Sequence, residues 1–336
     1  MKEAMFYQKL KDGVVQCQLC PHFCTIKLGE RGRCGVRENV AGKLYSLVYN
    51  RLATYAVDPV EKKPLFHFYP GEDAFSISTV GCNFSCLFCQ NYALSQSPKP
   101  DKEVYGELVT ANEVVSMAMA KNCSIISYTY SEPTIAFEYY YEIMRLAKSK
   151  GLRNTFVTNG FINSQPLKKL ANFLDAANVD LKSFSEEFYQ NIVGGSLKPV
   201  LDAIKLYHKL GIWVEVTTLV IPGKNDSEEE LYKIAEFIAG VDANIPWHIS
   251  RFFPYYKMQD VEPTPVETLL KAAELGKKAG LRYIYVGNVP LGSKYESTFC
   301  WKCGEIVIAR QGFYAQSHLK QGGVCPKCGA KIAGRF

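Results

Sequence analysis

Hydrophobic runs long enough to cross a membrane are absent from this sequence. A spanning helix needs about 18 consecutive apolar residues, and no run of that length occurs. The first residues, MKEAMFYQKLKDG, also lack the apolar core of a secretory signal peptide. We therefore expect a cytoplasmic protein without a membrane partner.

Blocks of like charge are absent as well. The net charge of +6 results from 39 basic and 33 acidic residues scattered along the 336-residue chain. Scattered charge is typical of a solvated surface, so a nucleic-acid partner is not indicated. Apolar residues make up 47% and charged residues 21% of the chain, which excludes extensive disorder and predicts a compact fold.

Cysteine is abundant instead, with 12 residues. In a reducing compartment, so many cysteines are expected to be metal ligands or redox groups rather than disulfides. Cys123 stands alone before an apolar run and is interpreted as a small core residue. The others fall into three groups: Cys17, Cys20, Cys24 and Cys34; Cys82, Cys86 and Cys89; and Cys300, Cys303, Cys325 and Cys328.

Between Phe75 and Asn288, short β-rich runs alternate with segments of helical spacing. The runs are AFSISTV, SIISYTY, RNTFVTN, AANVDLK, IWVEVTTLVI, PWHISRF and RYIYVGN. Helix caps are expected at Thr110 or Asn112, at Ser164 with Pro166 in the first turn, and at Asp226 or Ser227. The alternation predicts an α/β fold with a parallel sheet, arranged as a partial or complete (β/α) barrel.

Three segments follow from the cysteine groups and this alternation. We expect an N-terminal metal-binding segment with four cysteine ligands at 1–70, the barrel at 71–296 and a zinc-ribbon-like module at 297–336. No internal repeat interrupts this division.

The second cysteine group has the spacing CxxxCxxC and follows the first β-rich run directly. Loops after the carboxyl ends of parallel strands are where such folds bind ligands. A [4Fe-4S] cluster normally takes four thiolates, and no cysteine near the following strands is an obvious fourth ligand. One iron would then stay open for a substrate or cofactor. A structural zinc knuckle is the alternative interpretation.

This arrangement resembles the radical S-adenosylmethionine (SAM) superfamily, in which an aromatic residue such as Phe88 precedes the last cysteine. The resemblance implies that the open iron binds the amino and carboxylate groups of SAM. It further implies that an electron from the cluster cleaves SAM to a 5'-deoxyadenosyl radical, and that a flavodoxin-type or ferredoxin-type protein supplies the electron. Phe88 is expected beside the adenine.

Later segments extend the resemblance. TYSEPT resembles the GGE element that contacts the SAM amino group, with Tyr130 and Ser131 in place of both glycines. We expect that backbone contact to survive only if φ is negative there. VTNG and DLK resemble segments of the pyruvate formate-lyase activating enzymes, and the resemblance places Lys182 beside the SAM carboxylate; a solvent-facing lysine is the alternative. The candidate cofactor-binding residues are Phe88, Tyr130, Ser131, Glu132, Thr158, Asn159, Asp180 and Lys182.

The fifth and sixth runs depart from the activating enzymes. VIPGKND resembles their VVPGxxD, yet Thr217 stands near the place of their arginine and Tyr256 in the place of their histidine. His248 and Arg251 should point to opposite sides of a regular strand, so one of them is expected inside the barrel. A core histidine with a satisfied partner is the alternative for His248. The candidate catalytic residues are Lys182, His248 and Arg251.

The two outer cysteine groups need no ligand from elsewhere. The N-terminal group has four thiolates close in sequence, and both zinc and a second [4Fe-4S] cluster fit its spacing. We favour a structural site there, because the segment lies outside the barrel. CWKC and CPKCG form the two knuckles of a zinc ribbon, a closed site whose metal would fold the C-terminal module.

Together, these motifs resemble the AmmeMemoRadiSam-system radical SAM enzymes over essentially the whole chain. Those enzymes are encoded alongside proteins of the MEMO and AMMECR1 types, which the resemblance implies as partners. It does not supply a substrate. Activation of a glycyl-radical enzyme is the alternative within this class. A metal-folded RNA-binding or electron-transfer protein is the alternative from another class.

Overall fold

The computed structural model describes residues 1–99, 103–289 and 292–336. Its central sheet has eight strands, which run parallel except that the first pairs antiparallel with the second. In spatial order they are β8 (Thr54–Pro59), β9 (Asp73–Ser78), β11 (Ile125–Tyr128), β12 (Arg153–Thr158), β13 (Ala176–Asp180), β14 (Trp213–Val220), β15 (Trp247–Arg251) and β16 (Ile284–Gly287). All seven predicted β-rich runs therefore form strands of one sheet.

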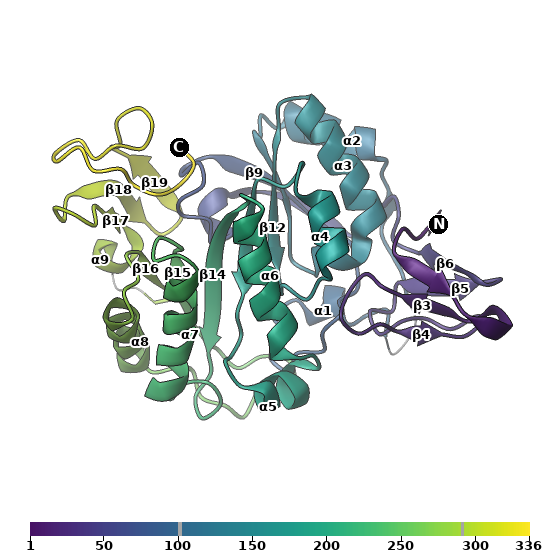
Figure 1. The fold of residues 1–336 in the computed structure, drawn as a ribbon. Helices are drawn as coiled ribbons and strands as arrows, with labels where there is room; N and C mark the ends of the chain where they lie inside the picture. The colour runs from purple at the N-terminus through teal and green to yellow at the C-terminus, as the bar shows by residue number, and fades with distance from the viewer. Residues whose placement is uncertain (100–102, 290–291) are drawn as a thin grey trace.

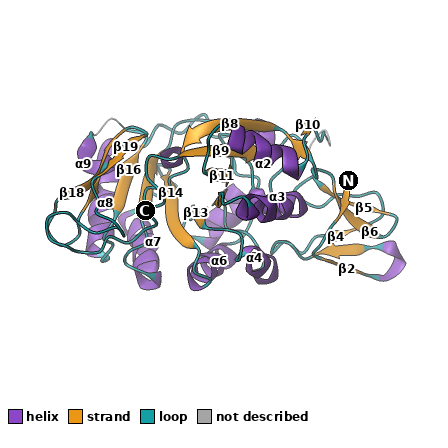
Figure 2. Cartoon of the chain, turned by 90° about the horizontal axis from the view of Figure 1, so that it is seen from above, coloured by secondary structure: helices purple, strands orange, loops and turns teal. Residues whose placement is uncertain are grey.

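The helices between these strands lie on the same face of the sheet (Figures 1 and 2). This follows because the parallel strands neighbour one another in chain order and each crossover is right-handed. The larger helices are α2 (Ala111–Ala120), α3 (Phe137–Ser149), α4 (Ser164–Leu170), α6 (Leu197–Lys209), α7 (Glu228–Val241) and α8 (Val266–Lys278). Short helical segments are η1 (Lys11–Gly13), η2 (Val60–Lys62), α1 (Tyr92–Ser95), η3 (Pro133–Ala136), α5 (Glu186–Phe188), η4 (Tyr189–Val193) and α9 (Ser293–Glu296).

Closure into a complete barrel does not occur in the part of the chain that the structure describes, because no pairing joins β16 to β8. The sheet is open, with these two strands as its edges.

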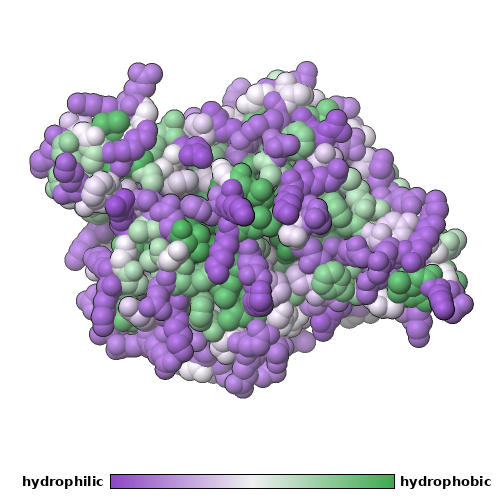
Figure 3. All heavy atoms as spheres, viewed as in Figure 1, coloured by the Kyte–Doolittle hydropathy of each residue, from purple (hydrophilic) through white to green (hydrophobic). Residues whose placement is uncertain are grey.

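Cys123 is buried in the main hydrophobic core, as predicted. No helix in the described ranges is both long enough and apolar enough to cross a membrane. On the face drawn in Figure 3, hydrophilic side chains separate the exposed hydrophobic ones into patches.

Two of the three predicted helix starts are confirmed. The Thr110 hydroxyl accepts a hydrogen bond from the Glu113 N–H of α2, and the Ser227 hydroxyl accepts one from the Glu230 N–H of α7. The cap predicted at Ser164 is wrong, because that residue is already the first of α4. Asn163 occupies the cap position, and its side chain donates to the Gln18 carbonyl at 2.7 Å instead. A contact with the N-terminal segment has replaced the local cap.

The N-terminal module consists of two small antiparallel sheets that pack at one end of the central sheet (Figure 1). Arg37 docks the module on α3, donating to Glu138 at 2.8 and 2.9 Å, and both side chains are buried. Strand β8 belongs by sequence to the predicted segment 1–70 but by pairing to the central sheet. The elements are β1 (Lys2–Glu3), β2 (Tyr7–Lys9), β3 (Val15–Cys17), β4 (Thr25–Ile26), β5 (Arg37–Val40) and β6 (Lys43–Ser46), followed by β7 (Arg51–Leu52), which pairs with β10 (Glu107–Leu108).

The C-terminal module is a three-stranded antiparallel sheet of β17 (Thr298–Phe299), β18 (Ile306–Gln311) and β19 (Tyr314–Ser317). It binds the segment between β8 and β9, which covers the inner face of the central sheet near the amino ends of β14 and β15. Arg310 donates to the Phe66 carbonyl, and its guanidinium lies 3.5 Å from Glu61. His67 bonds the Ala333 carbonyl at 2.7 Å. The opposite, carboxyl end of the sheet is left for ligands.

Candidate functional site

A cavity of about 440 Å³ opens at the carboxyl ends of the parallel strands. This is the edge at which parallel α/β folds bind ligands. The structure brings the second cysteine group and all the predicted cofactor-binding residues together here: Cys82, Cys86, Phe88, Cys89, Tyr130, Ser131, Glu132, Thr158, Asn159, Asp180 and Lys182 line the cavity.

The cysteine loop is held by glycine and by donors to sulfur. Gly81 has φ of +100°, and a Cβ there would lie 2.8 Å from Val36 and 2.9 Å from the Cys34 carbonyl oxygen. The Phe84 N–H donates to Cys82 Sγ at 3.3 Å, as donors to metal-bound thiolates do. Burial raises the pKa of the Cys86 thiol to about 11, so a bound metal would have to displace a proton.

Glu132 ties the ends of β11 and β12 together. Its carboxylate accepts hydrogen bonds from the Thr134 N–H at 3.0 Å, the Thr158 hydroxyl at 2.7 Å and the Asn159 N–H at 2.8 Å. Burial raises the pKa of this carboxyl, although the donors oppose the shift. Glu132 therefore shapes the cavity wall through contacts within the chain.

Tyr130 adopts a backbone conformation usual for glycine, with φ of +65°. The negative φ on which the expected backbone contact with SAM depended is therefore absent at Tyr130. A left-handed conformation costs a non-glycine residue roughly 1–2 kcal/mol. Contacts of the side chain offset that cost: the Tyr130 hydroxyl donates to Asp58, and the Lys63 ammonium lies 4.6 Å from the ring centroid and 2.6 Å from the same carboxylate.

Lys182 is half-buried on the cavity wall, with its side chain 13% exposed. Its Nζ lies 2.9 Å from Asp180 and 5.6 Å from the centroid of the Phe88 ring. Burial lowers the pKa of Lys182, but the charge and hydrogen bond of Asp180 together with the neighbouring Cys86 outweigh burial and leave the pKa above its ordinary value. The lysine is therefore held charged beside an aromatic wall.

His248 and Arg251 do not line the cavity. His248 shares the inner face of β15 with Ser250, which does line it, but lies deeper, with Nε2 2.7 Å from Glu215. Arg251 donates from Nε to the Thr264 carbonyl at 2.8 Å. Each side chain already has a protein partner, and for His248 this matches the alternative of a satisfied core histidine.

Sequence reasoning missed several cavity residues. Lys62 and Lys63 come from a segment assigned to the N-terminal region, and their only local signal is the spacing to Asp58, which resembles an ordinary surface ion pair. Thr217 and Ser250 could have been found, because strand alternation places them on the inner face near the carboxyl ends of β14 and β15.

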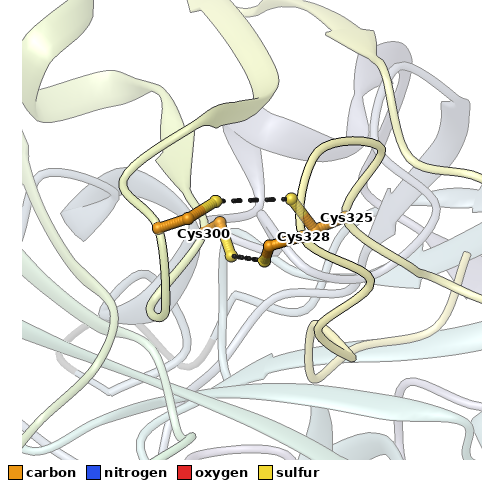
Figure 4. A group of neighbouring side chains, drawn as sticks. Cys300, Cys325 and Cys328 are labelled. Carbon is orange, nitrogen blue, oxygen red and sulfur yellow. Dashed lines mark hydrogen bonds between the residues drawn. The ribbon is translucent and has the colours of Figure 1, made fainter.

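The two outer cysteine groups differ in geometry. Figure 4 shows the C-terminal sulfurs pointing toward one another, with distances of 3.6 Å for Cys300–Cys328 and 3.7 Å for Cys303–Cys325. A Zn–S bond of about 2.3 Å implies sulfurs about 3.8 Å apart in a tetrahedron, so this group can hold one such ion. The N-terminal four instead surround a second, smaller cavity together with Arg37 and Asn83.

Comparison with known proteins supports the interpretation of the first site. The profile of the radical SAM superfamily matches residues 76–237, from the strand before the cysteine loop to α7. The chain belongs to the radical SAM superfamily. Membership implies a [4Fe-4S] cluster and SAM as cofactors, and the cavity fits them: three thiols on its wall leave one ligand position for a second molecule.

The relatives of this radical SAM chain include activating enzymes. An uncharacterized protein of Methanocaldococcus jannaschii is 46% identical over 338 residues and matches 99% of both chains. A putative glycyl-radical enzyme activating enzyme of the same organism is 28% identical, over 65% of this chain and 80% of its own. Pyruvate formate-lyase 1-activating enzyme of Escherichia coli is 25% identical, over 61% and 89%.

A solved structure shares the fold. Streptococcus suis SuiB bound to S-adenosylmethionine superposes with a TM-score of 0.53 at 15% identity, over 72% of this chain and 56% of SuiB. At this identity the likeness extends to the fold alone.

Proposed function

We propose that this chain is a radical SAM enzyme that holds a [4Fe-4S] cluster through Cys82, Cys86 and Cys89. When bound, that cluster would cleave SAM reductively to a 5'-deoxyadenosyl radical, which abstracts hydrogen from a substrate. The observation that carries the proposal is the shared cavity. Three cysteines line it, and they lie opposite polar residues at the carboxyl ends of six strands, β11 to β16.

The chain's own residues would bind and orient SAM in this cavity. Phe88, 5% exposed, offers an apolar wall for the adenine. The charged Lys182 is available to the SAM carboxylate, and Asp180 holds it in place. Glu132, through its three hydrogen bonds, fixes the rim formed by Thr158 and Asn159.

The test is anaerobic reconstitution with iron and sulfide, followed by a reductant and SAM. We expect the wild type to release 5'-deoxyadenosine and the Cys86→Ala variant to release none. Cys123→Ala is the matched control, because it removes a buried cysteine outside every group and should leave release unchanged. Intact SAM in the presence of cluster-replete wild type would refute the proposal.

A second candidate function is activation of a glycyl-radical enzyme. The activating enzymes of Methanocaldococcus jannaschii and Escherichia coli favour it, since this chain matches 80% and 89% of their lengths. Incubation with SAM, a reductant and a glycyl-radical enzyme such as pyruvate formate-lyase should then produce the glycyl-radical EPR signal. SAM cleavage without that signal would leave the first candidate and exclude this one for the enzyme tested.

The remaining assignments belong to the same proposal. We place zinc at the C-terminal cysteines, because their sulfur spacing matches a tetrahedral ion. The proposed setting is the cytoplasm, where the 12 unpaired cysteines would stay reduced. A flavodoxin-type or ferredoxin-type protein would supply electrons, and MEMO-type and AMMECR1-type proteins would be partners.

A further inference from the structure

We propose that Cys17, Cys20, Cys24 and Cys34 hold a second [4Fe-4S] cluster rather than a zinc ion. This replaces the expectation of a purely structural site, which relied on the segment lying outside the barrel. The assignment concerns what the site binds and does not depend on SAM cleavage.

The spread of the sulfur atoms separates the two metals. A zinc ion draws four thiolates to about 3.8 Å from one another, whereas in a [4Fe-4S] cluster each thiolate binds a different iron and the sulfurs stand farther apart. Among the described residues, which include every cysteine, only the C-terminal group brings three or more potential ligands within 4.8 Å. Neither the N-terminal group nor the cysteines of the SAM site bring three sulfurs within 4.8 Å of one another.

A buried arginine lines the cavity together with these cysteines. Arg37 lines the N-terminal cavity, and its side chain is 2% exposed. Its terminal nitrogens bond Glu138 and the Ile135 carbonyl, but Nε has no partner among the residues that the structure describes. An unpaired buried N–H costs about 1–3 kcal/mol. The sulfides of an iron–sulfur cluster would supply acceptors inside the cavity, beyond the cysteine sulfurs alone.

The N-terminal site also shares a wall with the SAM site. Asn83 lines the N-terminal cavity and is the residue after Cys82. His22 Nε2 lies 2.7 Å from the Asn83 carbonyl oxygen, while Asn159 donates to Asn83 Oδ1 at 2.7 Å and lies 3.8 Å from Cys82 Sγ. Zinc has no redox chemistry. A second cluster here would lie across the wall formed by Asn83 from the first.

The direct test is metal analysis of the triple variant Cys82→Ala/Cys86→Ala/Cys89→Ala after anaerobic reconstitution. We expect about four irons and four sulfides per chain to remain, with about one zinc at the C-terminal site, and a reduced-cluster EPR signal. The reciprocal variant Cys17→Ala/Cys20→Ala should hold about four irons fewer than the wild type and keep only the signal of the cluster at Cys82, Cys86 and Cys89. A triple variant with no iron and about two zinc ions per chain would overturn the assignment.

Wild-type protein gives the same answer if the variants fail to fold. The proposal predicts about eight irons for each zinc, and a zinc site at the N-terminus predicts about four irons for two zinc ions. The EPR spectrum of the reduced wild type should show the signals of two clusters. Four irons with the signal of one cluster would refute the proposal even if SAM is cleaved. Eight irons would support it even if SAM stays intact.

Discussion

Mild acid is expected to loosen the C-terminal module through His67. Nδ1 of this fully buried ring lies 2.7 Å from the Ala333 carbonyl, which only accepts, so Nδ1 carries the proton. Arg310 donates to the Thr298 hydroxyl at 2.8 Å, Thr298 lies 2.7 Å from the Tyr285 hydroxyl, and Tyr285 lies 2.6 Å from His67 Nε2. Because arginine only donates, this chain of donors ends at Nε2 as an acceptor. Protonation of Nε2 would place its new proton against the Tyr285 hydroxyl proton and break this hydrogen bond.

The sign and size of the effect follow from the pKa. Burial lowers the pKa of His67 to about 4, against the raising influence of Glu215, whereas the unfolded value is about 6.5. The neutral ring therefore makes its full contribution to the free energy of unfolding above a pH of about 6.5, and this contribution is lost as the pH falls toward 4. The whole interval corresponds to roughly 3 kcal/mol, and the step from pH 7.5 to 5.5 to roughly 1.3 kcal/mol.

The assay is anaerobic urea unfolding at pH 7.5 and 5.5, followed by tryptophan fluorescence. Trp213 stacks against the His67 ring at a centroid distance of 6.2 Å and reports on this region. The His67→Asn variant keeps an N–H for Ala333 but does not titrate, and acid effects on the metal sites cancel between the two proteins. We expect the wild type to lose about 1 kcal/mol more than the variant over this step. Equal losses would refute the hydrogen-bond assignment.

Three further predictions concern the ends of the central sheet. Gly81→Ala should lower the thermal midpoint and the iron content, at a cost on the order of 1–3 kcal/mol, while Gly223→Ala, with positive φ but no neighbour within 4 Å, should retain its iron. In urea unfolding, Arg37→Met should lower the free energy of unfolding by about 3–5 kcal/mol, because it leaves the buried Glu138 carboxylate without its ion-pair partner. Adding Glu138→Leu should restore most of that loss. Tyr130→Phe should cost about 1 kcal/mol in urea unfolding by removing one donor from its carboxylate partner, and a neutral result would show that the hydroxyl does not offset the backbone strain.

Local patterns in the sequence sufficed for much of the architecture. Strand alternation and helix signals depend on backbone periodicity within a few residues, so all seven parallel strands were predictable. Parallel order then required the carboxyl ends of these strands to meet, which placed the CxxxCxxC loop and Lys182 in one cavity. The paired CxxC spacings likewise predicted the tight group of C-terminal sulfurs.

Only the tertiary structure decided which distant side chains became partners. Packing on the inner face of the sheet and docking of the N-terminal module bring together residues far apart in sequence, which hydrophobic periodicity does not predict. The pairs are Asp58 with Tyr130, Glu215 with His248, and Arg37 with Glu138. The same holds for the strand pairing of β8 and the positive φ at Tyr130. Sequence spacing determines only the order of ligands along the chain, so it did not decide which metal the N-terminal cysteines bind. Their separation in space is set by the fold that surrounds them.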